Sequence, residues 1–305
     1  MPELPEVETI SRQLNEVLVG RVIKAVNIYR EKNFIGESPD LLEKTIKRVK
    51  RRAKVIEIEL DDFDGLVQVH LKMTGQLIFT KKSQKTKNST SKASHLGGQA
   101  KIQSEETRIV GGHPSADWVS ELPNKHTRVE ILFEDDARLF FNDMRAFGWM
   151  KIVQKNQKIE NSKIQVPDVV DEEFSLEYFE SVLVKSKKPV KIVLLDQSLM
   201  GGVGNIYAND ALNMAKILPS RNSNSLNKEE LQNLYSAVKY VIDLGIKCGG
   251  ASAANYVDTK GLGGTYQNHF LVYKRDGQIC NNCGGNIVKI KLGGRGTFYC
   301  KDCQV

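Results

Sequence analysis

The sequence predicts an α+β fold: an N-terminal helix with an antiparallel β-sandwich or barrel, then a helical second half, then a zinc-binding β-hairpin. Three observations carry this prediction. Apolar and polar residues alternate in the first half, apolar residues take up a helical period from about residue 173, and two Cys-x-x-Cys pairs close the chain. At 305 residues the chain is long enough to bury a core in each half.

The composition is that of a globular protein with an excess of positive charge. Hydrophobic residues make up 40% of the chain and charged residues 27%, which excludes wholesale disorder. The net charge of +7 favours an anionic partner such as a nucleic acid. Membrane attachment is not expected, because the long apolar run that it needs is missing.

Residues 3–19 are predicted to form the first helix. Apolar side chains recur there every three or four residues, which places them on one face, and the pattern stops at Gly20. The side chains of this face are Leu4, Val7, Ile10, Leu14 and either Val17 or Leu18.

Four later segments alternate with a period of two, as strands with one buried face do. They are VIEIEL at 55–60, LVQVHL at 66–71, RVEILF at 128–133 and ARLFF at 137–141. Breakers such as Asp-Gly at 64–65 separate them. We expect these strands to build the antiparallel part of the fold.

Two polar stretches interrupt the periodic segments. Residues 81–125 are rich in Lys, Ser, Thr, Gln and Gly, and they are too polar to pack and too long for an ordinary hairpin. We interpret them as a mobile polar insertion. Residues 154–170 are interpreted as an interdomain linker.

The second half has the period of helices. Apolar stripes run through EEFSLEYFESVLVKS, PVKIVLLDQSLM and NIYANDALNMAKIL. The clearest helix covers 228–247, where Asn227 and Glu230 are spaced as a capping box and Gly249-Gly250 ends the pattern.

The last segment has the ligands of a metal site. Two Cys-x-x-Cys pairs with sixteen residues between them have the spacing of a tetrathiolate zinc site. The alternative, two disulfides, needs an oxidising compartment, and the sequence shows no secretory signal. The stretch KIKLGGRGTFYC between the pairs predicts a hairpin with Arg295 at its tip, a cation suited to phosphate or base recognition. The zinc ligands are Cys280, Cys283, Cys300 and Cys303.

The N-terminus, Met1-Pro2-Glu3-Leu4-Pro5-Glu6, supports two interpretations. One is helix initiation, where proline is tolerated in the first turn and the two glutamates complement the helix dipole. The other starts from removal of Met1, which would expose the secondary amine of Pro2. An α-amine has a pKa of roughly 8, so part of it is neutral and nucleophilic at pH 7. Adjacent carboxylates can then move protons.

Four further segments are ambiguous taken singly. KTIKRVKRRAK at 44–54 holds seven cations in eleven residues, either a solvated face or a phosphate contact through Lys54. The glycine-rich turn before NIYA at 205–208 suits a phosphate at a helix N-terminus, or a tight turn between helices. In HLKMTG and DMRAFG, Met73 and Phe147 fit a core and Arg145 fits a surface ion pair.

Taken together and in order, these segments resemble the formamidopyrimidine-DNA glycosylase and endonuclease VIII family. The matching segments are PELPEVET at 2–9, RRAK at 51–54, HLKMTG at 70–75, KHTRVE at 125–130, DMRAFG at 143–148, GGVGNIYA at 201–208 and GRGTFYC at 294–300. The resemblance covers essentially the whole chain.

The resemblance implies a three-part architecture with double-stranded DNA lying between the halves. It predicts a catalytic β-sandwich domain over 1–155, a helix–two-turn–helix domain over 170–262 and a zinc finger over 263–305. The chain is then expected to act as a monomer in the cytoplasm, associated with the nucleoid when it acts on DNA that contains oxidised bases or abasic sites.

The resemblance also implies roles for matching positions. Pro2 resembles the nucleophile that attacks the damaged nucleotide and forms an imine with its opened sugar, Glu3 the acid/base, and Glu6 a support for the flipped nucleotide. The phosphate grip is expected from Lys54, Asn205 and Arg295, with His70 and His126 as additional contacts. The wedge that fills the gap left by the flipped base is expected from Met73, Arg145 and Phe147.

The expected activity is that of a bifunctional DNA glycosylase and abasic-site lyase for oxidised purines, chiefly 8-oxoguanine and formamidopyrimidines, acting through β- and δ-elimination. One alternative is the same chemistry on oxidised pyrimidines. The other is a non-catalytic zinc-containing DNA-binding protein. The zinc ion is expected to be structural, and the glycine-rich segment 249–267 is expected to cover the flipped base.

Overall fold

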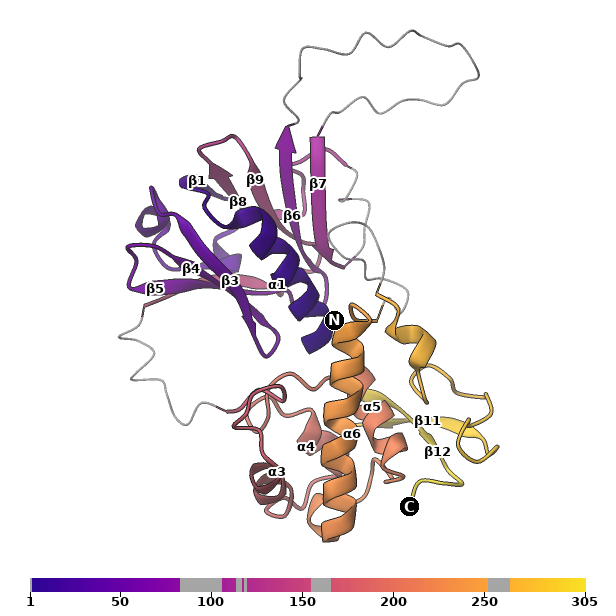
Figure 1. The fold of residues 1–305 in the computed structure, drawn as a ribbon. Coiled ribbons are helices and arrows are strands. Elements are labelled where there is room, and N and C mark those ends of the chain that lie inside the picture. Colours follow the sequence, from indigo (N-terminus) through magenta and orange to yellow (C-terminus); the bar gives the residue numbers. More distant parts are fainter. Residues whose placement is uncertain (1, 83–105, 114–116, 118–119, 155–165, 252–263) are drawn as a thin grey trace, which may run out of the picture.

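The computed structural model describes residues 2–82, 106–113, 117, 120–154, 166–251 and 264–305. Within these ranges the first half of the chain is a β-sandwich with one long helix against it. The second half is a group of helices followed by a two-stranded hairpin (Figure 1). The α+β fold class is therefore confirmed.

Two five-stranded sheets make the sandwich, and every pair of strands is antiparallel except the short contact between β10 and β2. The first sheet has the order β1 (Ile23–Ile28), β8 (Thr127–Phe133), β9 (Arg138–Asp143), β6 (Gly75–Lys82) and β7 (Glu106–Gly112). The second has the order β2 (Phe34–Ile35), β10 (Trp149–Gln154), β5 (Gly65–His70), β4 (Val55–Leu60) and β3 (Ile46–Arg52). Short 3₁₀ turns, η1 (Glu31–Asn33) and η2 (Ser38–Leu41), lie between β1 and β3.

The four predicted strands correspond to β4, β5, β8 and β9, and the other six were not predicted. In β3 the reason is a break in the alternation. Its buried residues Ile46 and Val49 are three positions apart, because the pairing with β4 shifts register between Ile46 and Arg48. The cation-rich run therefore includes an edge strand.

The expectation of a mobile insertion over 81–125 is wrong at both ends. β6 continues to Lys82, and β7 pairs with it from Gln76 opposite Gly112 to Lys82 opposite Glu106. Gly111 of β7 allows close packing, since a Cβ there would lie 2.8 Å from Ile10 Cγ1. Residues 83–105, the middle of the predicted insertion, lie outside the described residues.

Helix α1 (Leu4–Leu18) joins the two cores of the molecule. Its predicted face is buried, and from Val7 to Leu18 it packs into the sandwich core. It lies against β3 and β7, the edge strands of the two sheets, and Asn15 Oδ1 accepts a hydrogen bond of 2.8 Å from Val49 N of β3. Leu4, in contrast, packs in the core of the helical half.

The described residues of the helical half form four α-helices. They are α3 (Leu176–Leu183), α4 (Val190–Leu194), α5 (Asn205–Met214) and α6 (Lys228–Lys247). The predicted capping box is present at α6, where Asn227 Oδ1 accepts from Glu230 N and the Glu230 carboxylate accepts from Asn227 N. Short 3₁₀ turns η4 (Ser223–Ser225) and η5 (Tyr266–His269) precede and follow α6. The predicted linker lies largely in 155–165, outside the described residues.

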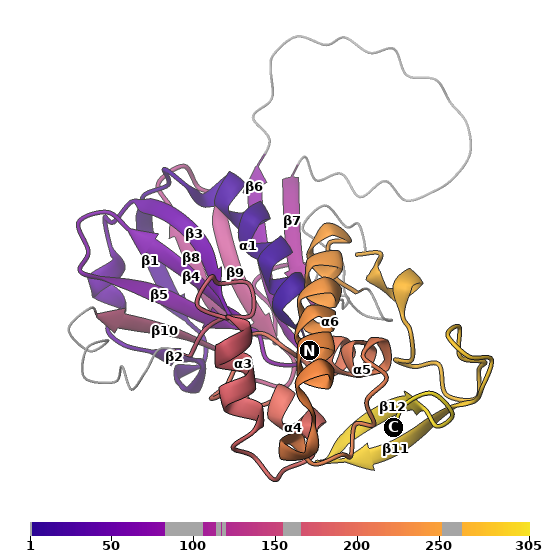
Figure 2. The same ribbon diagram turned by 60° about the horizontal axis from the view of Figure 1, so that its bottom comes forward.

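The C-terminal hairpin consists of β11 (Ile287–Leu292) and β12 (Arg295–Cys300) and lies beside α4 and α5 (Figure 2). Gly293 and Gly294 form its turn with φ of 56° and 76°, values that favour glycine. Gly293 also touches Ile192 of α4 so closely that a Cβ there would overlap it. Arg295 follows this turn, so its predicted place at the tip is confirmed.

A buried ion-pair cluster joins the sandwich to the helical half. Arg51, 5% exposed, donates to Glu8 Oε2 of α1 at 2.7 Å and to Asp168 Oδ2. Asp168 Oδ2 also accepts from Ala53 N at 2.6 Å, and residue 168 forms a β-bridge with Gly201. One carboxylate therefore holds the β3–β4 turn against the segment before α5.

Replacement of Arg51 with methionine would remove the cation that pairs with the buried Asp168 and would leave Glu8 paired with Arg12 alone. We expect the free energy of unfolding to fall by roughly 3–5 kcal/mol, the usual cost of removing one partner of a buried ion pair. Urea denaturation measures this change. The control is Arg48→Met, because Arg48 is exposed on the same strand, and we expect that change to stay within about 0.5 kcal/mol. Equal losses in the two variants would contradict the structural role of the Arg51 cluster.

Candidate active site

The first turn of α1 places Pro2, Glu3 and Glu6 in the interface between the two halves. All three are buried. Glu6 Oε2 accepts a hydrogen bond of 2.7 Å from Glu3 N, which satisfies one of the free N–H groups at the start of the helix. Glu6 thus has the predicted role in helix initiation. The side chain of Glu3 extends instead to the helical half.

The carboxylate of Glu3 lies on the N-terminus of α5. Glu3 Oε1 accepts from Ile206 N at 3.0 Å, and Glu3 Oε2 has no hydrogen-bond partner among the described residues. Gly204 makes this approach possible, because any Cβ at that position would overlap the Glu3 carboxyl group. The helix terminus that the sequence suggests for a phosphate therefore holds a carboxylate of the same chain.

Glu6 connects the same turn to the end of α6. Its Oε1 accepts from the Tyr207 hydroxyl at 2.8 Å and from Ala251 N at 2.7 Å. Gly250, with φ of 85°, packs on Glu6, and a Cβ there would lie 2.7 Å from Glu6 Cγ. Glu6 thus holds the start of the glycine-rich segment 249–267, whose middle, 252–263, lies outside the described residues.

Burial and neighbouring charges set the proton affinity of Glu3. Burial raises the pKa of Glu3 to about 7, opposed by Lys54 and reinforced by Glu6. Lys54 is 6% exposed and donates to Val203 O at 2.8 Å, and burial lowers its pKa while Glu3 raises it and Arg295 lowers it. A carboxyl group with a pKa near 7 can both give and accept a proton at neutral pH.

Lys191 is a second buried cation near this site, and sequence reasoning missed it. Burial lowers the pKa of Lys191 to about 7, with Glu3 raising it and Arg295 lowering it. Its Nζ donates to Gly296 O at 3.1 Å and to Thr297 Oγ1 at 2.7 Å on β12. The available signal was a lysine inside the apolar stretch PVKIVLL, where a solvated cation is not expected.

Met73, Arg145 and Phe147 gather on the surface, so Met73 and Phe147 are not core residues. Met73 is 41% exposed and Phe147 is 52% exposed. The Arg145 guanidinium lies 4.8 Å from the centroid of the Phe147 ring, and its Nη1 lies 3.3 Å from Met73 Sδ. Asp143 holds this turn by accepting from Arg145 N and Gly148 N.

The two predicted histidine contacts occupy different environments. Burial, followed by Lys72 and Lys54, lowers the pKa of His70 to about 4, so its ring is neutral at pH 7. His70 Nδ1 accepts from Lys72 N at 3.0 Å. His126 Nδ1 lies 3.0 Å from Asp117 Oδ1, and the His126 carbonyl accepts from Asp143 N, beside the turn that holds Arg145.

The four predicted zinc ligands converge at the base of the hairpin. Their sulfur atoms all lie within 4.8 Å of one another, with 3.9 Å between Cys280 and Cys303 and 3.4 Å between Cys283 and Cys300. Four thiolates at about 2.3 Å from a tetrahedral zinc ion are about 3.8 Å apart, so the cluster fits this metal. None of the four cysteines forms a disulfide.

Each of the three parts of the chain matches a known protein family. Residues 1–150 match the formamidopyrimidine-DNA glycosylase N-terminal domain, and residues 166–256 match the formamidopyrimidine-DNA glycosylase H2TH domain. Residues 277–305 match the zinc finger found in FPG and IleRS. The chain belongs to the formamidopyrimidine-DNA glycosylase family. It is therefore a DNA glycosylase, and its cysteine cluster is a structural zinc site.

Whole-length relatives agree with this assignment. The formamidopyrimidine-DNA glycosylase of Herpetosiphon aurantiacus is 34% identical over 310 residues, covering 100% of both chains. That of Enterococcus faecalis is 34% identical over 313 residues, covering 100% of this chain and 97% of its own. A solved complex of Lactococcus lactis Fpg with DNA containing an abasic site has a TM-score of 0.80 at 29% identity, covering 99% of both chains.

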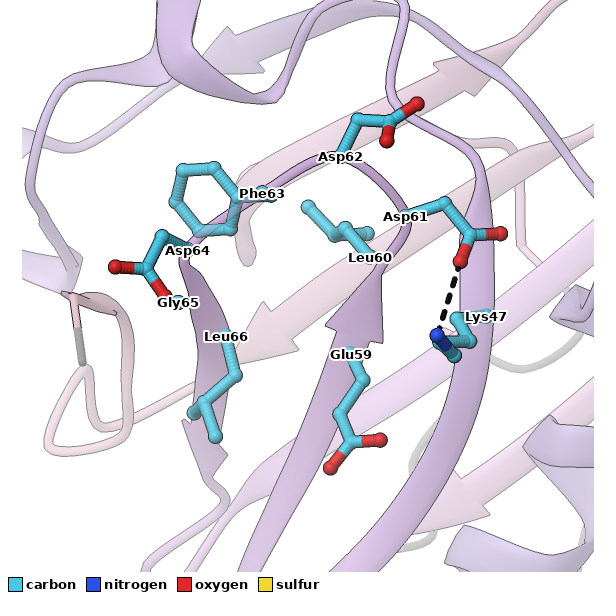
Figure 3. Close-up of a pocket in the computed structure, with 9 residues that line it drawn as sticks. All are labelled: Lys47, Glu59, Leu60, Asp61, Asp62, Phe63, Asp64, Gly65 and Leu66. Carbon is cyan, nitrogen blue, oxygen red and sulfur yellow. Dashed lines mark ion pairs between the residues drawn. The ribbon is translucent and has the colours of Figure 1, made fainter.

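The glycosylase has a surface hollow at the turn between β4 and β5 (Figure 3). It encloses about 630 Å³ and is lined by acidic residues of that turn, where Lys47 Nζ lies 3.4 Å from Asp61 Oδ1. None of the predicted catalytic or DNA-binding residues lines it. Within the described ranges, none of the helices has both the length and the apolar character needed to cross a bilayer.

Glu3→Gln should change stability with a pH dependence of known sign. The pKa of Glu3 is about 7 in the folded glycosylase against an ordinary value of 4.5, so folding binds a proton and stability falls as pH rises between these values. Parent and variant should unfold alike near pH 4. At pH 8 the variant should be more stable by roughly 1–3 kcal/mol, measured by urea denaturation.

Glu8→Gln provides the control on the same helix. Burial alone would raise the pKa of Glu8, but Arg51 and Arg12 lower this pKa from its ordinary value of 4.5. The Glu8 carboxylate therefore stabilises the fold above about pH 4.5, and its loss should destabilise the glycosylase at pH 8. If Glu3→Gln and Glu8→Gln change the free energy of unfolding at pH 8 in the same direction, the opposite pKa shifts assigned to the two carboxyl groups are wrong.

Proposed function

We propose that this glycosylase is bifunctional: it excises oxidised purines from double-stranded DNA and then cleaves the strand as an abasic-site lyase, with Pro2 as the nucleophile. The observation that carries the proposal is the buried Glu3 carboxyl group, next to Pro2 and on the N-terminus of α5, with a pKa of about 7. Glu3 is thus a proton donor next to the secondary amine that Pro2 exposes once Met1 is removed.

The chemistry follows from these two groups. Once Met1 is removed, the neutral secondary amine of Pro2 attacks C1′ of the damaged nucleotide, and the base leaves with its bonding electrons. The Pro2 nitrogen then loses its proton, and the departing base takes up a proton. Glu3 gives a proton to the sugar ring oxygen, so the ring opens and the nitrogen lone pair forms a double bond to C1′, which gives a positively charged imine (an iminium ion). Loss of a proton from C2′ then expels the 3′ phosphate, and a second elimination expels the 5′ phosphate. Water finally releases Pro2.

Lys54, Asn205 and Arg295 are proposed to hold the phosphates around the flipped nucleotide. They come from the β3–β4 turn, the N-terminus of α5 and the tip of the zinc hairpin, and these three elements meet around Glu3. Phosphate neutralisation by cations such as Lys54 and Arg295 supplies much of the affinity of proteins for DNA. His70 and His126 are proposed as additional contacts on the sandwich side.

Met73, Arg145 and Phe147 are proposed as the wedge. An exposed apolar ring with a guanidinium stacked on it is costly in water but suits the space between base pairs. Flipping a base out of the stack costs a few kcal/mol, and a wedge of this kind offsets part of that cost. Glu6 is proposed to support the flipped nucleotide through its contacts with Gly250 and Ala251 at the start of segment 249–267.

Oxidised purines are the favoured substrate class because this wedge trio resembles that of the purine-specific branch of the family. Oxidised pyrimidines are the alternative. Solved complexes of Lactococcus lactis Fpg include one with Fapy-dG DNA, at 30% identity and a TM-score of 0.80, and one with oxidised-pyrimidine DNA, at 30% identity and a TM-score of 0.78. Competing cleavage of the two lesion types in one reaction separates the two specificities.

Borohydride trapping tests the proposed chemistry. Borohydride reduces an imine to a stable amine, so duplex DNA carrying one 8-oxoguanine opposite cytosine should become covalently bound to the protein. Peptide mass analysis should place the adduct on Pro2, and Pro2→Gly should slow trapping at least about tenfold while binding of an uncleavable abasic analogue is unchanged.

Two results would overturn this assignment. An adduct on a lysine instead of Pro2 would show a different nucleophile. No adduct on purine or pyrimidine lesions, from protein that has lost Met1, would favour the non-catalytic DNA-binding protein. An oxidised-pyrimidine duplex that traps faster than the 8-oxoguanine duplex would reverse the substrate preference but retain the mechanism.

Arg295→Ala tests the phosphate grip. The variant should bind every duplex more weakly, and the slope of log affinity against log salt should become shallower by about 0.9, the effect of one lost phosphate contact. Lys301→Ala is the matched control, because this exposed cation follows β12 at the end opposite the tip. If the slope is unchanged in Arg295→Ala, or changes equally in both variants, Arg295 does not contact a phosphate.

A further inference from the structure

The hairpin strand β12 has one edge paired with β11 and the other edge along α5. The backbone groups that face α5 come from alternate residues, Gly296, Phe298 and Cys300, because successive residues of a strand point their N–H and C=O groups to opposite sides. Side-chain amides hydrogen-bond to all three of these residues. Each residue on this edge therefore has a backbone group that is hydrogen-bonded without a third strand.

A stripe of three asparagines on α5 provides this contact. Asn205, Asn209 and Asn213 are four residues apart and so lie on one face of the helix. Asn205 Nδ2 donates to Gly296 O at 3.1 Å, and Asn209 Oδ1 accepts from Phe298 N at 2.9 Å. Asn209 also donates from Nδ2 to the carbonyl of Asn205, which fixes the orientation of its amide.

The third asparagine reaches the strand through a glutamine. Asn213 Nδ2 donates to Gln304 Oε1 at 2.9 Å, and the same oxygen accepts from Cys300 N at 2.8 Å. Gln304 Nε2 is held by Ile217 O at 2.8 Å. Asn209, Asn213 and Gln304 are at most 1% exposed, so these bonds form away from water, where an unmade bond is costly.

The spacing of the two elements allows this pairing. Four residues of an α-helix rise about 6.0 Å, and two residues of an antiparallel strand rise about 6.8 Å. Amides at every fourth helical position can therefore meet every second residue of the strand. A slip of the hairpin by one residue would present the groups that already bond to β11, so the stripe does not accept that register.

The zinc site cannot provide this constraint at the tip. Its ligands lie at the base of the hairpin, where Cys300 pairs with Ile287, and Arg295 is five residues further along β12. Five strand residues span about 17 Å. The metal thus fixes the base, and the contacts with Asn205, Asn209 and Lys191 fix the half of β12 that carries Arg295.

We infer that the asparagine stripe of α5 sets the register and distance of the zinc hairpin on the helix, and that Asn209 is a positioning residue for Arg295. Asn209 itself touches neither DNA nor zinc in this role. The part of this inference that concerns DNA rests on the proposed phosphate contact of Arg295. The part that concerns the hairpin stands without it.

Hydrogen exchange of the DNA-free, zinc-loaded protein tests the hairpin itself. Asn209→Ala should raise the exchange rate of the Phe298 amide on the order of tenfold or more, with one zinc retained per chain, because a single buried hydrogen bond protects that amide. Asn213→Ala should instead raise exchange at Cys300. Asn233→Ala, which truncates an exposed asparagine of α6, should change neither. An unchanged Phe298 amide in Asn209→Ala would overturn the inference.

A double-mutant cycle then tests the link to Arg295. Asn209→Ala should reduce the salt slope of binding to an abasic-analogue duplex by up to the same 0.9 that Arg295→Ala removes. Adding Arg295→Ala to Asn209→Ala should then cost much less affinity than it costs in the parent. Additive losses, with zinc retained and thermal unfolding unchanged, would show that Asn209 does not act through Arg295.

The two experiments separate failure of the inference from failure of the proposed function. If Arg295→Ala alone leaves the salt slope unchanged, the phosphate role is wrong. Faster exchange at Phe298 in Asn209→Ala would in that case still establish the register role. If Asn209→Ala does not fold, Asn213→Ala decides, because local release of the Cys300 amide with zinc retained is expected only if the stripe holds β12.

Discussion

The contact between the Glu3 carboxylate and the N-terminus of α5 is the one on which the rest of the structure depends. It requires a glycine at 204, a helix that begins at Asn205, and an α1 whose later turns are fixed in the sandwich core. The same turn supplies Val203 O to Lys54. Packing of the sandwich against the helical half therefore places Glu3, Lys54 and the start of α5 together. Leu4, the residue after Glu3, is part of the core of the helical half.

This arrangement of buried ionisable groups is costly for the stability of the fold. Glu3 is a buried carboxyl group whose Oε2 has no hydrogen-bond partner in the described part of the chain, and burial lowers the pKa values of Lys54 and Lys191. Such groups are poor choices for stability alone. The Arg51 cluster offsets part of this cost at the same joint, because its two carboxylates hold the β3–β4 turn that carries Lys54. Arg51, which joins the two halves, and Lys54, which lies at the candidate site, thus belong to one short segment.

The sequence was informative where one periodicity dominated. The α1 stripe, the four alternating strands, α6 with its capping box, and the cysteine hairpin were predictable because local pattern and tertiary burial agree there. β3 was missed because a bulge breaks its alternation, and β7 because it lies in a polar stretch. Lys191 and the partnership of Arg51 with Asp168 depend on contacts between distant segments, which no local pattern contains. The turn at 201–204 was found, but its occupant, Glu3, was not.

The asparagine stripe also limits how long the zinc hairpin can be. Four residues of the helix rise about 0.8 Å less than two residues of the strand, so the asparagines and the backbone groups they bind move out of alignment with every repeat. Over two repeats the misalignment reaches about 1.6 Å, more than the roughly 0.5 Å over which the donor–acceptor distance of an ordinary N–H···O hydrogen bond varies. Direct contact is indeed made at Gly296 and Phe298, and at Cys300 the amide of Gln304 bridges the gap to Asn213. A fourth repeat would find no partner in reach, so a helix can grip a strand in this way over about six residues, the length of β12.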